Sequence, residues 1–202
     1  MTVEIRLATP DDAPGILAIY APFCASSHVS FETVPPTEAA MRERIARITE
    51  QFPWLVCEID GEIAGYVYAS QHRERAAYRW AVDVAVYVAE AHRRRSVGCA
   101  LYTSLLALVR DLGYFQAYAG ITLPNSGSVG LHEAMGFEQV AFFPNVGFKM
   151  GQWRDVGWWR LQLTPVVDDP KNPRPFRELH DSPSVYKALN EGMQRIRLAR
   201  AN

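Results

Sequence analysis

Cysteine is scarce in this sequence of 202 residues, which contains only Cys24, Cys57 and Cys99. The three lie far apart along the chain, so they form neither the framework of a disulfide-rich fold nor the closely spaced pairs of a zinc site. The pair His132–Glu133 also lacks the second histidine of a zinc-binding helix. We therefore expect free thiols in a reducing cytoplasm and assign no metal.

A surplus of charge and a long apolar run are also missing. The chain has 21 Lys and Arg against 22 Asp and Glu, a formal net charge of −1. That balance lacks the basic excess of a nucleic-acid binder, and no apolar stretch is long enough to span a bilayer. Charged residues stand near the N-terminus where a signal peptide needs an apolar core. We expect no nucleic-acid or membrane partner.

Proline is distributed unevenly. Five prolines fall between residues 165 and 183, in a polar stretch that predicts an extended arm. Ser182–Pro183 then has the form of a helix start, and we expect a last helix over about residues 183–200. We accordingly divide the chain into a domain at 1–164 and an arm with a C-terminal helix at 165–202. The helix is expected to dock on its own domain or on a partner subunit, away from the reaction centre.

The rest of the chain alternates between strand and helix patterns. Strands are predicted at 3–8, 54–59, 62–69, 116–121, 137–143 and 157–163. Helices are predicted at about 9–24, after a cap at Thr37 with an apolar face through Ile48, and at 128–135. Asp60–Gly61 is a strong hairpin signal, and residues 146–156 are expected to join the last two strands. The order predicts an α+β sandwich, in which helices flank a mixed, mostly antiparallel sheet.

The central unit is the stretch from Ala81 to Gly113. An apolar β-branched run ends in an arginine-rich turn, and an amphipathic helix pattern follows it. A helix N-terminus binds anions, three consecutive arginines at 93–95 add attraction, and Gly98 allows close approach to the backbone. We interpret the turn as a pyrophosphate cradle. The alternative is an ordinary strand–helix connection with solvated arginines.

Arg93-Arg-Arg-Ser-Val-Gly98 resembles the acetyl-coenzyme A signature of the GNAT acetyltransferases, with Ser96 where that family usually has glycine. If the position needs a positive φ, serine is strained there. A second GNAT element follows at Leu123-Pro-Asn125 and at the helix ending in Gly136-Phe137. The resemblance implies acetyl-CoA as co-substrate, held by Val86, Tyr87, Val88, Arg93, Arg94, Arg95, Ser96, Val97, Gly98, Cys99 and Asn125.

Within the superfamily, residues 4–163 resemble the phosphinothricin N-acetyltransferases. The shared motifs include Phe52-Pro-Trp-Leu-Val, Leu-His132-Glu-Ala-Met-Gly-Phe and Asp155-Val-Gly-Trp. The resemblance implies the GNAT fold, a homodimer, and acetyl transfer to the α-amine of a small amino acid analogue of the phosphinothricin or methionine sulfoximine type.

Two residues are candidate acid–base groups. Asp83 takes the place of the family's glutamate on the central strand and, being shorter, would work through a water molecule. His132 stands where many relatives have tyrosine and is the second candidate base, or the acid for the departing thiolate. The alternative for His132 is a structural histidine in the core. Backbone N–H groups near Tyr87 and Val88 are candidates to hold the thioester carbonyl.

The substrate residues are expected in two loops. Arg73 and Arg75 suit a tetrahedral oxyanion, and Phe31, Glu32 and Tyr78 complete the predicted pocket. The alternative is that the two arginines are solvated loop charges. Two other functions stay open: an acetyltransferase for another amine or a peptide N-terminus, and a non-catalytic acetyl-CoA-binding module.

Overall fold

The sheet has seven strands, in a computed structural model that describes residues 2–196. Their order is β1-β2-β3-β4-β5-β7-β6, and only β4 and β5 run parallel. This confirms the predicted mixed, mostly antiparallel sheet. The strands are β1 (Val3–Leu7), β2 (Trp54–Ile59), β3 (Glu62–Gln71), β4 (Ala81–Val88), β5 (Gln116–Leu123), β6 (Glu138–Lys149) and β7 (Gln152–Gln162).

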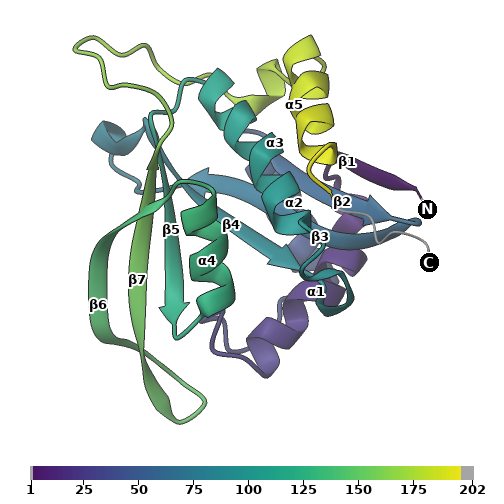
Figure 1. The fold of residues 1–202 in the computed structure, drawn as a ribbon, viewed down its shortest axis with the longest axis vertical. Helices are drawn as coiled ribbons and strands as arrows, with labels where there is room; N and C mark the ends of the chain where they lie inside the picture. The colour runs from purple at the N-terminus through teal and green to yellow at the C-terminus, as the bar shows by residue number, and fades with distance from the viewer. Residues whose placement is uncertain (1, 197–202) are drawn as a thin grey trace.

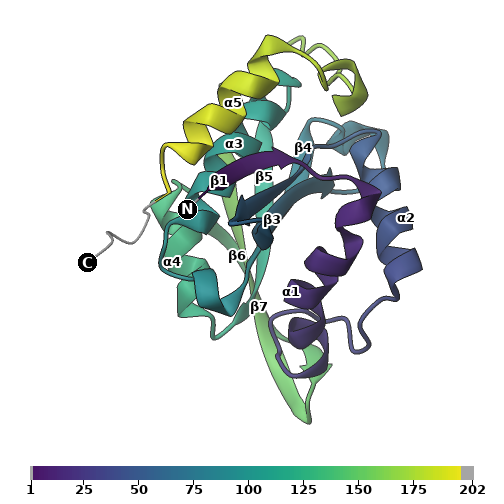
Figure 2. The same cartoon turned by 90° about the vertical axis from the view of Figure 1, so that its right-hand side faces the viewer.

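Helices cover both faces of the sheet (Figures 1 and 2). One face carries α1 (Ala13–Ala25) and α2 (Glu38–Thr49), and the other carries α3 (Val97–Asp111), α4 (Ser126–Ala134) and α5 (Pro183–Met193). Side-chain caps fix two of the starts. Thr37 Oγ1 accepts a hydrogen bond from Ala40 N at 3.2 Å, and Asn125 Oδ1 accepts one from Ser128 N at 3.1 Å.

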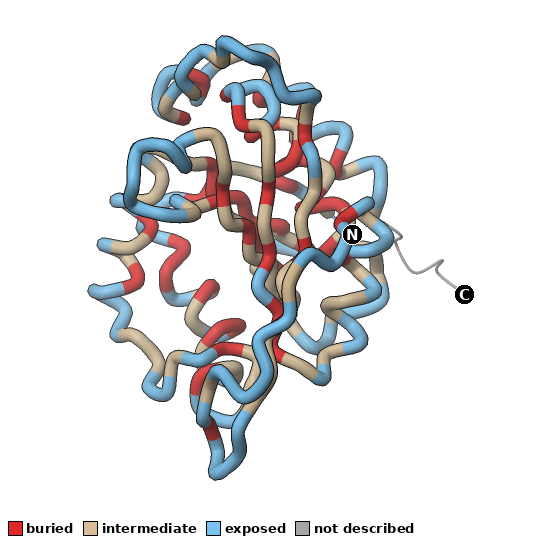
Figure 3. Tube along the Cα trace, turned by 90° about the vertical axis from the view of Figure 1, so that its left-hand side faces the viewer, coloured by how far each residue is buried: buried red, intermediate tan, exposed pale blue. Residues whose placement is uncertain are grey.

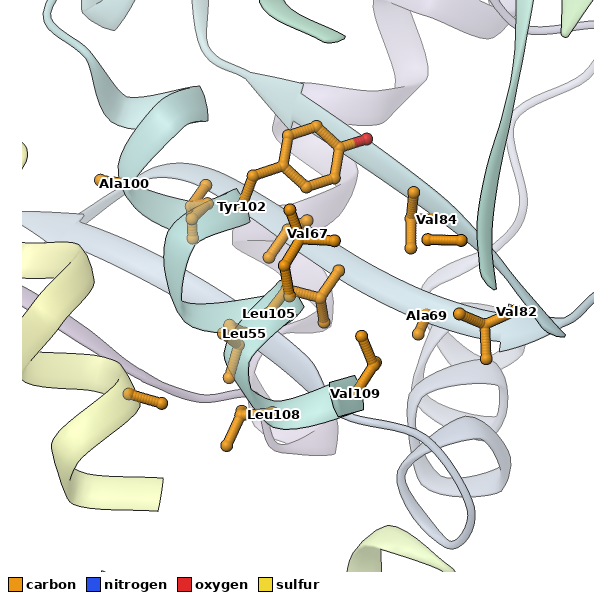
Figure 4. Close-up of a cluster of buried hydrophobic side chains, with 14 of the residues drawn as sticks. Leu55, Val67, Ala69, Val82, Val84, Ala100, Tyr102, Leu105, Leu108 and Val109 are labelled. Carbon is orange, nitrogen blue, oxygen red and sulfur yellow. The ribbon is translucent and has the colours of Figure 1, made fainter. Parts of the chain in front are cut away.

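Each layer has its own core. The larger one lies between the sheet and α3, where Leu105 and Leu108 are fully buried in one cluster with Val67 and Val82 (Figure 4). The smaller one joins α1 and α2 to the aromatic face of β2 and β3. Buried positions therefore run along the middle of the molecule and exposed ones along its rim (Figure 3). The apolar stripe predicted for α3 is the face that is buried.

The β6–β7 hairpin is longer than the sequence predicted. The prediction that residues 146–156 join two short strands was wrong, because β6 continues to Lys149 and β7 begins at Gln152. Met150 and Gly151 make the turn with φ of 54° and 73°, the left-handed pair that suits a tight hairpin. An irregular register between Phe143 and Gly147 interrupts the pairing, so strand alternation is hard to recognise there.

The C-terminal segment packs on its own domain. Phe176 is 1% exposed, and its N–H donates to Gln51 O at 3.0 Å. The final helix, α5, lies against α3 and β1, and Val185 and Ala188 enter the larger core. The helix ends at Met193, earlier than predicted, and the remainder of its predicted range from 197 on lies outside the described residues. The division at 164/165 stays a prediction.

Contact between α5 and α3 depends on a glycine. A Cβ atom on Gly192 would lie 2.6 Å from the backbone oxygen of Ala100 and 2.1 Å from Ser104 Oγ. Gly130 in α4 is also helical, but a Cβ atom there would meet nothing within 4 Å. The two glycines thus form a matched pair for measuring how tightly α5 is seated.

We expect Gly192→Ala to destabilise the protein by about 1–3 kcal/mol, because the added methyl group overpacks the α3–α5 contact. Gly130→Ala should instead be neutral or stabilising by up to about 1 kcal/mol, the usual effect of alanine inside a helix. Denaturant unfolding of both variants beside the wild type measures the difference. Equal stability of the two variants would mean that α5 does not pack as described.

Candidate active site

The sheet opens between its two parallel strands. β4 and β5 pair only where Ala81–Asp83 lies beside Gln116–Tyr118, and in the described residues the ladder goes no further. Beyond Asp83 a cavity of about 60 Å³ lies between the two strands. Val86 and Tyr87 line it from β4, and Tyr102, Asn125 and His132 line it from α3 and the α4 region. The opening leaves backbone N–H and C=O groups on one edge of β4 available to a ligand.

The two candidate acid–base residues lie on opposite faces of the sheet. Side chains alternate along β4: Val82 and Val84 belong to the core under α3, whereas Tyr87 packs into the core under α1 and α2. Asp83 shares the face of Tyr87. His132 is on α4, on the other side, next to Tyr102 and Phe137. Asp83 and His132 therefore cannot both take part in transferring the same proton.

His132 is buried, 3% exposed, and both ring nitrogens are engaged. Nδ1 lies 2.8 Å from Ser128 O, which can only accept, so Nδ1 donates. Nε2 then accepts from the hydroxyl of Tyr102 at 2.7 Å. Burial lowers the pKa of His132 below its usual 6.5, against a smaller opposing effect of the Ser128 hydrogen bond. The imidazole is neutral near pH 7, and the Tyr102 hydroxyl stands beside it in the cavity lining.

Asp83 makes a close contact that the sequence analysis did not foresee. His72 Nδ1 lies 2.6 Å from Asp83 Oδ1. Burial raises the pKa of the Asp83 carboxyl above its usual 3.8, while the hydrogen bond to His72 and the charges of His72 and Arg73 oppose the rise. Arg73 therefore lies near enough to Asp83 for its charge to act there.

The predicted cofactor loop contains two residues with positive φ and leads into the N-terminus of α3. Arg94 and Ser96 adopt left-handed conformations with φ of 62° and 65°, so the strain expected at Ser96 is present. Ser96 precedes the first turn of α3, whose N–H groups have no partner within the helix. A Cβ atom on Gly98 would lie 2.9 Å from Leu131 Cδ2. Arg93 places its guanidinium over the ring of Phe23, 5.8 Å from the centroid.

The predicted substrate residues lie on the α1–α2 side in two loops. The ring of Phe31 fills the space above Gly147, and Glu32 pairs with Arg44 at 2.9 Å. Arg73 and Arg75 are exposed in the loop before β4, and Tyr78 presents the edge of its ring to His72. The fold thus places the 72–78 loop beside Asp83 through His72, whereas the 25–36 loop lies at the other end of the opening, where the hydroxyl of Thr122 donates to Val29 O at 3.4 Å.

Lys149 fixes the second of these loops. It is 5% exposed, and its Nζ donates to the backbone oxygens of Phe23, Ser30 and Glu32 at 3.1, 2.6 and 2.8 Å. Three carbonyl acceptors satisfy the three donors of an ammonium group. The turn end of the β6–β7 hairpin therefore holds the 25–36 loop over the cleft.

Sequence reasoning missed His72, Tyr102 and Lys149. Tyr102 falls on the buried stripe of α3, where an aromatic residue is usually core, and its polar end meets His132 only in the folded chain. His72 lies 11 residues before Asp83, and only the turn between β3 and β4 brings them together. Lys149 contacts residues more than 100 positions away, a distance over which a single sequence carries no signal.

Residues 2–196 contain neither a metal-binding cluster nor a membrane-spanning helix. Within this range there is no group of three or more His, Cys, Asp and Glu side chains placed to hold a metal ion. None of the helices described has both the length and the apolar character needed to cross a membrane.

Comparison with known proteins gives consistent matches. The family model described as an acetyltransferase (GNAT) domain matches residues 5–158. A phosphinothricin N-acetyltransferase of Streptomyces viridochromogenes is 38% identical over 175 residues, which are 87% of this chain and 93% of that protein. An L-methionine sulfoximine/L-methionine sulfone acetyltransferase of Pseudomonas paraeruginosa is 33% identical over 173 residues, 84% of this chain and 100% of that protein.

A solved structure agrees with these sequences. The crystal structure of a GNAT superfamily phosphinothricin acetyltransferase from Sinorhizobium meliloti, in complex with AcCoA, superposes with a TM-score of 0.79. That chain is 32% identical, and the match covers 88% of this chain and 100% of that one.

Proposed function

The chain belongs to the GNAT acetyltransferase family, and we propose that it moves the acetyl group of acetyl-CoA to the α-amine of a small amino acid analogue of the phosphinothricin or methionine sulfoximine type. The observation that supports this most is the opening between β4 and β5, which has Asp83 on one face and the Tyr102–His132 pair on the other. Named relatives with these activities cover nearly the whole domain.

Acetyl-CoA fits the residues present. The left-handed backbone at Arg94 and Ser96 turns N–H groups of the loop toward one side, and the N-terminus of α3 adds its partial positive charge. Arg93, Arg94 and Arg95 supply cations for the phosphates. The cleft edge at Val86–Val88 offers backbone donors to the pantetheine arm and the thioester carbonyl. When bound, acetyl-CoA supplies the activated acyl group.

The amine approaches on the Asp83 face. Attack on the thioester requires a neutral amine, so a group on this face must take a proton from the ammonium form that dominates near pH 7. Asp83 and its partner His72 are placed to receive it. Arg73 and Arg75, on the neighbouring loop, bind the acidic groups of the amino acid, since guanidinium groups suit carboxylate and phosphinate oxygens.

The leaving thiolate receives its proton on the other face. Both nitrogens of His132 are already engaged in hydrogen bonds. The group that gives the thiolate its proton is therefore the hydroxyl of Tyr102, which also lines the cavity. Burial raises the pKa of Tyr102 above its usual 10, which keeps the hydroxyl protonated near pH 7. His132 orients that hydroxyl by accepting from it in the resting state. This division gives each face of the sheet one proton transfer.

Turnover tests the function directly. Thiol release from acetyl-CoA should be fastest with phosphinothricin and methionine sulfoximine in a panel that also contains ordinary amino acids, simple amines and short peptides. Faster turnover with a peptide N-terminus or a simple amine would favour the alternative acetyltransferase. Binding of acetyl-CoA without thiol release on any member would favour the non-catalytic module.

We further propose that the protein is a homodimer, in which the β6–β7 hairpin contacts a second copy. β6 is an edge strand of the sheet, and the hairpin exposes several large apolar side chains. Phe148 and Trp153 lie opposite each other, with ring centroids 5.3 Å apart, and are 59% and 61% exposed. An apolar edge of this kind usually marks an interface. Tyr186 on α5 is equally exposed, at 61%, and lies elsewhere.

We expect Trp153→Glu to shift the protein from dimer to monomer, because a buried unpaired carboxylate opposes association. Sedimentation velocity over a range of concentrations measures the shift. Tyr186→Glu is the matched control and should leave the dimer unchanged. A monomeric wild type, or a Trp153→Glu dimer as tight as the wild type, would remove the hairpin as the interface.

We place the enzyme in the cytoplasm. All three cysteines are free, and Cys24 and Cys57 are buried as unpaired thiols, which suits a reducing compartment.

A further inference from the structure

We propose that His72 is the base that takes the proton from the substrate ammonium group, and that Asp83 acts by holding and polarising His72. The proposal rests on the acetyl-transfer function above and deepens it. It replaces the water-mediated role that the sequence suggested for Asp83 with a direct imidazole contact.

The hydrogen bond between the two residues sets the tautomer of His72. An ionised carboxylate can only accept, so Nδ1, 2.6 Å from Asp83 Oδ1, carries the proton. The lone pair then lies on Nε2. Among residues 2–196, Nε2 has no hydrogen-bond partner, and the side chain as a whole is 12% exposed. A nearly buried imidazole with one nitrogen fixed and the other free is arranged to accept a proton from a ligand.

Aromatic side chains hold the ring in place. His72 stacks on Tyr118 with centroids 4.5 Å apart and planes 15° apart. Tyr78 and Trp158 meet it edge-on at 6.0 and 5.9 Å. Side chains from β5, from the loop before β4 and from β7 therefore restrict the ring, in addition to its own backbone in the turn after β3. A solvated surface histidine paired by chance with a carboxylate would not be enclosed in this way.

Location connects the ring with the substrate. Tyr118 is the β5 residue opposite Asp83, at the last pair before β4 and β5 separate. His72 therefore lies over the point at which the cleft begins, on the face that carries the 72–78 loop. Tyr78, which the sequence assigned to the substrate pocket, touches the same ring.

Imidazole suits this proton transfer better than a carboxylate does. A general base works best when its own affinity for protons matches the working pH, and histidine is the side chain that ordinarily changes charge near neutrality. A carboxylate is a weak base toward an ammonium group. Aspartate is also one methylene shorter than the glutamate that the family has at this position. The hydrogen bond to His72 compensates for this, because the imidazole ring carries the basic nitrogen further toward the substrate.

Nε2 of His72 takes one proton from the substrate ammonium group, and the resulting imidazolium is stabilised by the Asp83 carboxylate. The neutral amine nitrogen forms the bond to the acetyl carbon, the C–S bond breaks, and the second proton of that nitrogen passes to solvent as the amide forms. The thiolate gains a proton from Tyr102 on the opposite face, and both side chains return to their resting states by exchange with solvent.

The charged and titratable groups facing His72 are few. Asp83 contacts it from β4, Tyr118 from β5 and Tyr78 from the following loop, and the charge of Arg73 acts on the Asp83 carboxyl. Trp158, from β7, is neutral. Of these groups, only Asp83 is negatively charged near pH 7, so it is the one that stabilises an imidazolium.

The test is His72→Asn. Asparagine keeps an N–H donor close to the position of Nδ1, so it can still hold Asp83, but it has no equivalent of Nε2. We expect kcat/KM for the amine to fall about 100-fold, with the KM for acetyl-CoA unchanged. The acidic limb of the wild-type pH profile should also disappear, apart from the slope due to the amine itself.

His180→Asn is the matched control. His180 also pairs with a carboxylate, Asp181 at 3.0 Å, but it is 57% exposed on the C-terminal arm. This variant should behave as the wild type in rate and in pH profile. Because His180–Asp181 is also a histidine–aspartate contact through Nδ1, the comparison separates the loss of a base from the loss of any His–Asp pair.

The outcomes are distinct. The proposal would be overturned if His72→Asn had the same kcat/KM and pH profile as the wild type. It would also be overturned if the wild-type enzyme itself showed no acidic limb. Either result would leave Asp83 as the base. If His72→Asn lowers thermal stability, His72→Gln with restored activity in added imidazole provides the second test, and absence of rescue there would also count against it. A wild type with no turnover on any amine would refute the proposed function itself, and this assignment with it.

Discussion

Replacing Asp83 by Asn is expected to lower kcat for the amine substrate about 100-fold, the usual effect of losing an acid–base group. The side chain is close to the same size, so the fold and the hydrogen-bond geometry to His72 are largely kept while the negative charge is lost. Acetyl-CoA affinity should stay near the wild-type value, because Asp83 lies on the face of the sheet opposite Tyr102 and His132. Steady-state kinetics and calorimetry measure the two quantities.

His132→Ala should also lower kcat by up to about 100-fold, because it affects the proton transfer to the thiolate and not the one from the amine. This change removes the acceptor that orients Tyr102 and leaves a cavity beside α3, so thermal stability should fall as well. Asp83→Asn, which creates no cavity, should not share that loss. Wild-type turnover in both variants would refute the catalytic assignment, and loss of stability in Asp83→Asn would show that its role is structural.

Gly98→Asp is expected to abolish acetyl-CoA binding. Gly98 is the second residue of α3, and even a Cβ atom there would lie 2.9 Å from the end of the Leu131 side chain. Aspartate adds bulk and places a negative charge among the donors proposed to bind the pyrophosphate, where both oppose an anion. Isothermal calorimetry with acetyl-CoA measures the loss.

Two companion variants separate size from charge. Gly98→Ala displaces only the flexible end of Leu131 and should weaken binding modestly, whereas Gly98→Asn has the bulk of aspartate without its charge and should fall between the two. Unchanged affinity in Gly98→Asp would remove the cradle from this loop. An equal loss of acetyl-CoA affinity in Gly98→Asn and Gly98→Asp would show that steric exclusion alone is responsible.

Local patterns in the sequence were sufficient for most elements of the fold. The hairpin at Asp60–Gly61, the cap at Thr37 and the buried stripe of α3 are each set by residues within a few positions of one another. The positive φ of Ser96 had been raised only as a condition, on the ground that the GNAT signature usually has glycine at this position. The β6–β7 hairpin was the exception, since its irregular register hides the alternation on which strand prediction depends.

The sequence by itself determined most of the elements, a strand–turn–helix unit at 81–113 that is a candidate anion site, and which residue types are available for acid–base chemistry. Only the tertiary structure decided how those residues are used. It places Asp83 and His132 on opposite faces of one strand pair. It also engages both nitrogens of His132 in hydrogen bonds with Tyr102 and Ser128, and it brings His72 within hydrogen-bond distance of Asp83. Such contacts depend on strand order and on the facing of side chains across the sheet, and these are fixed by long-range packing, which no local pattern encodes.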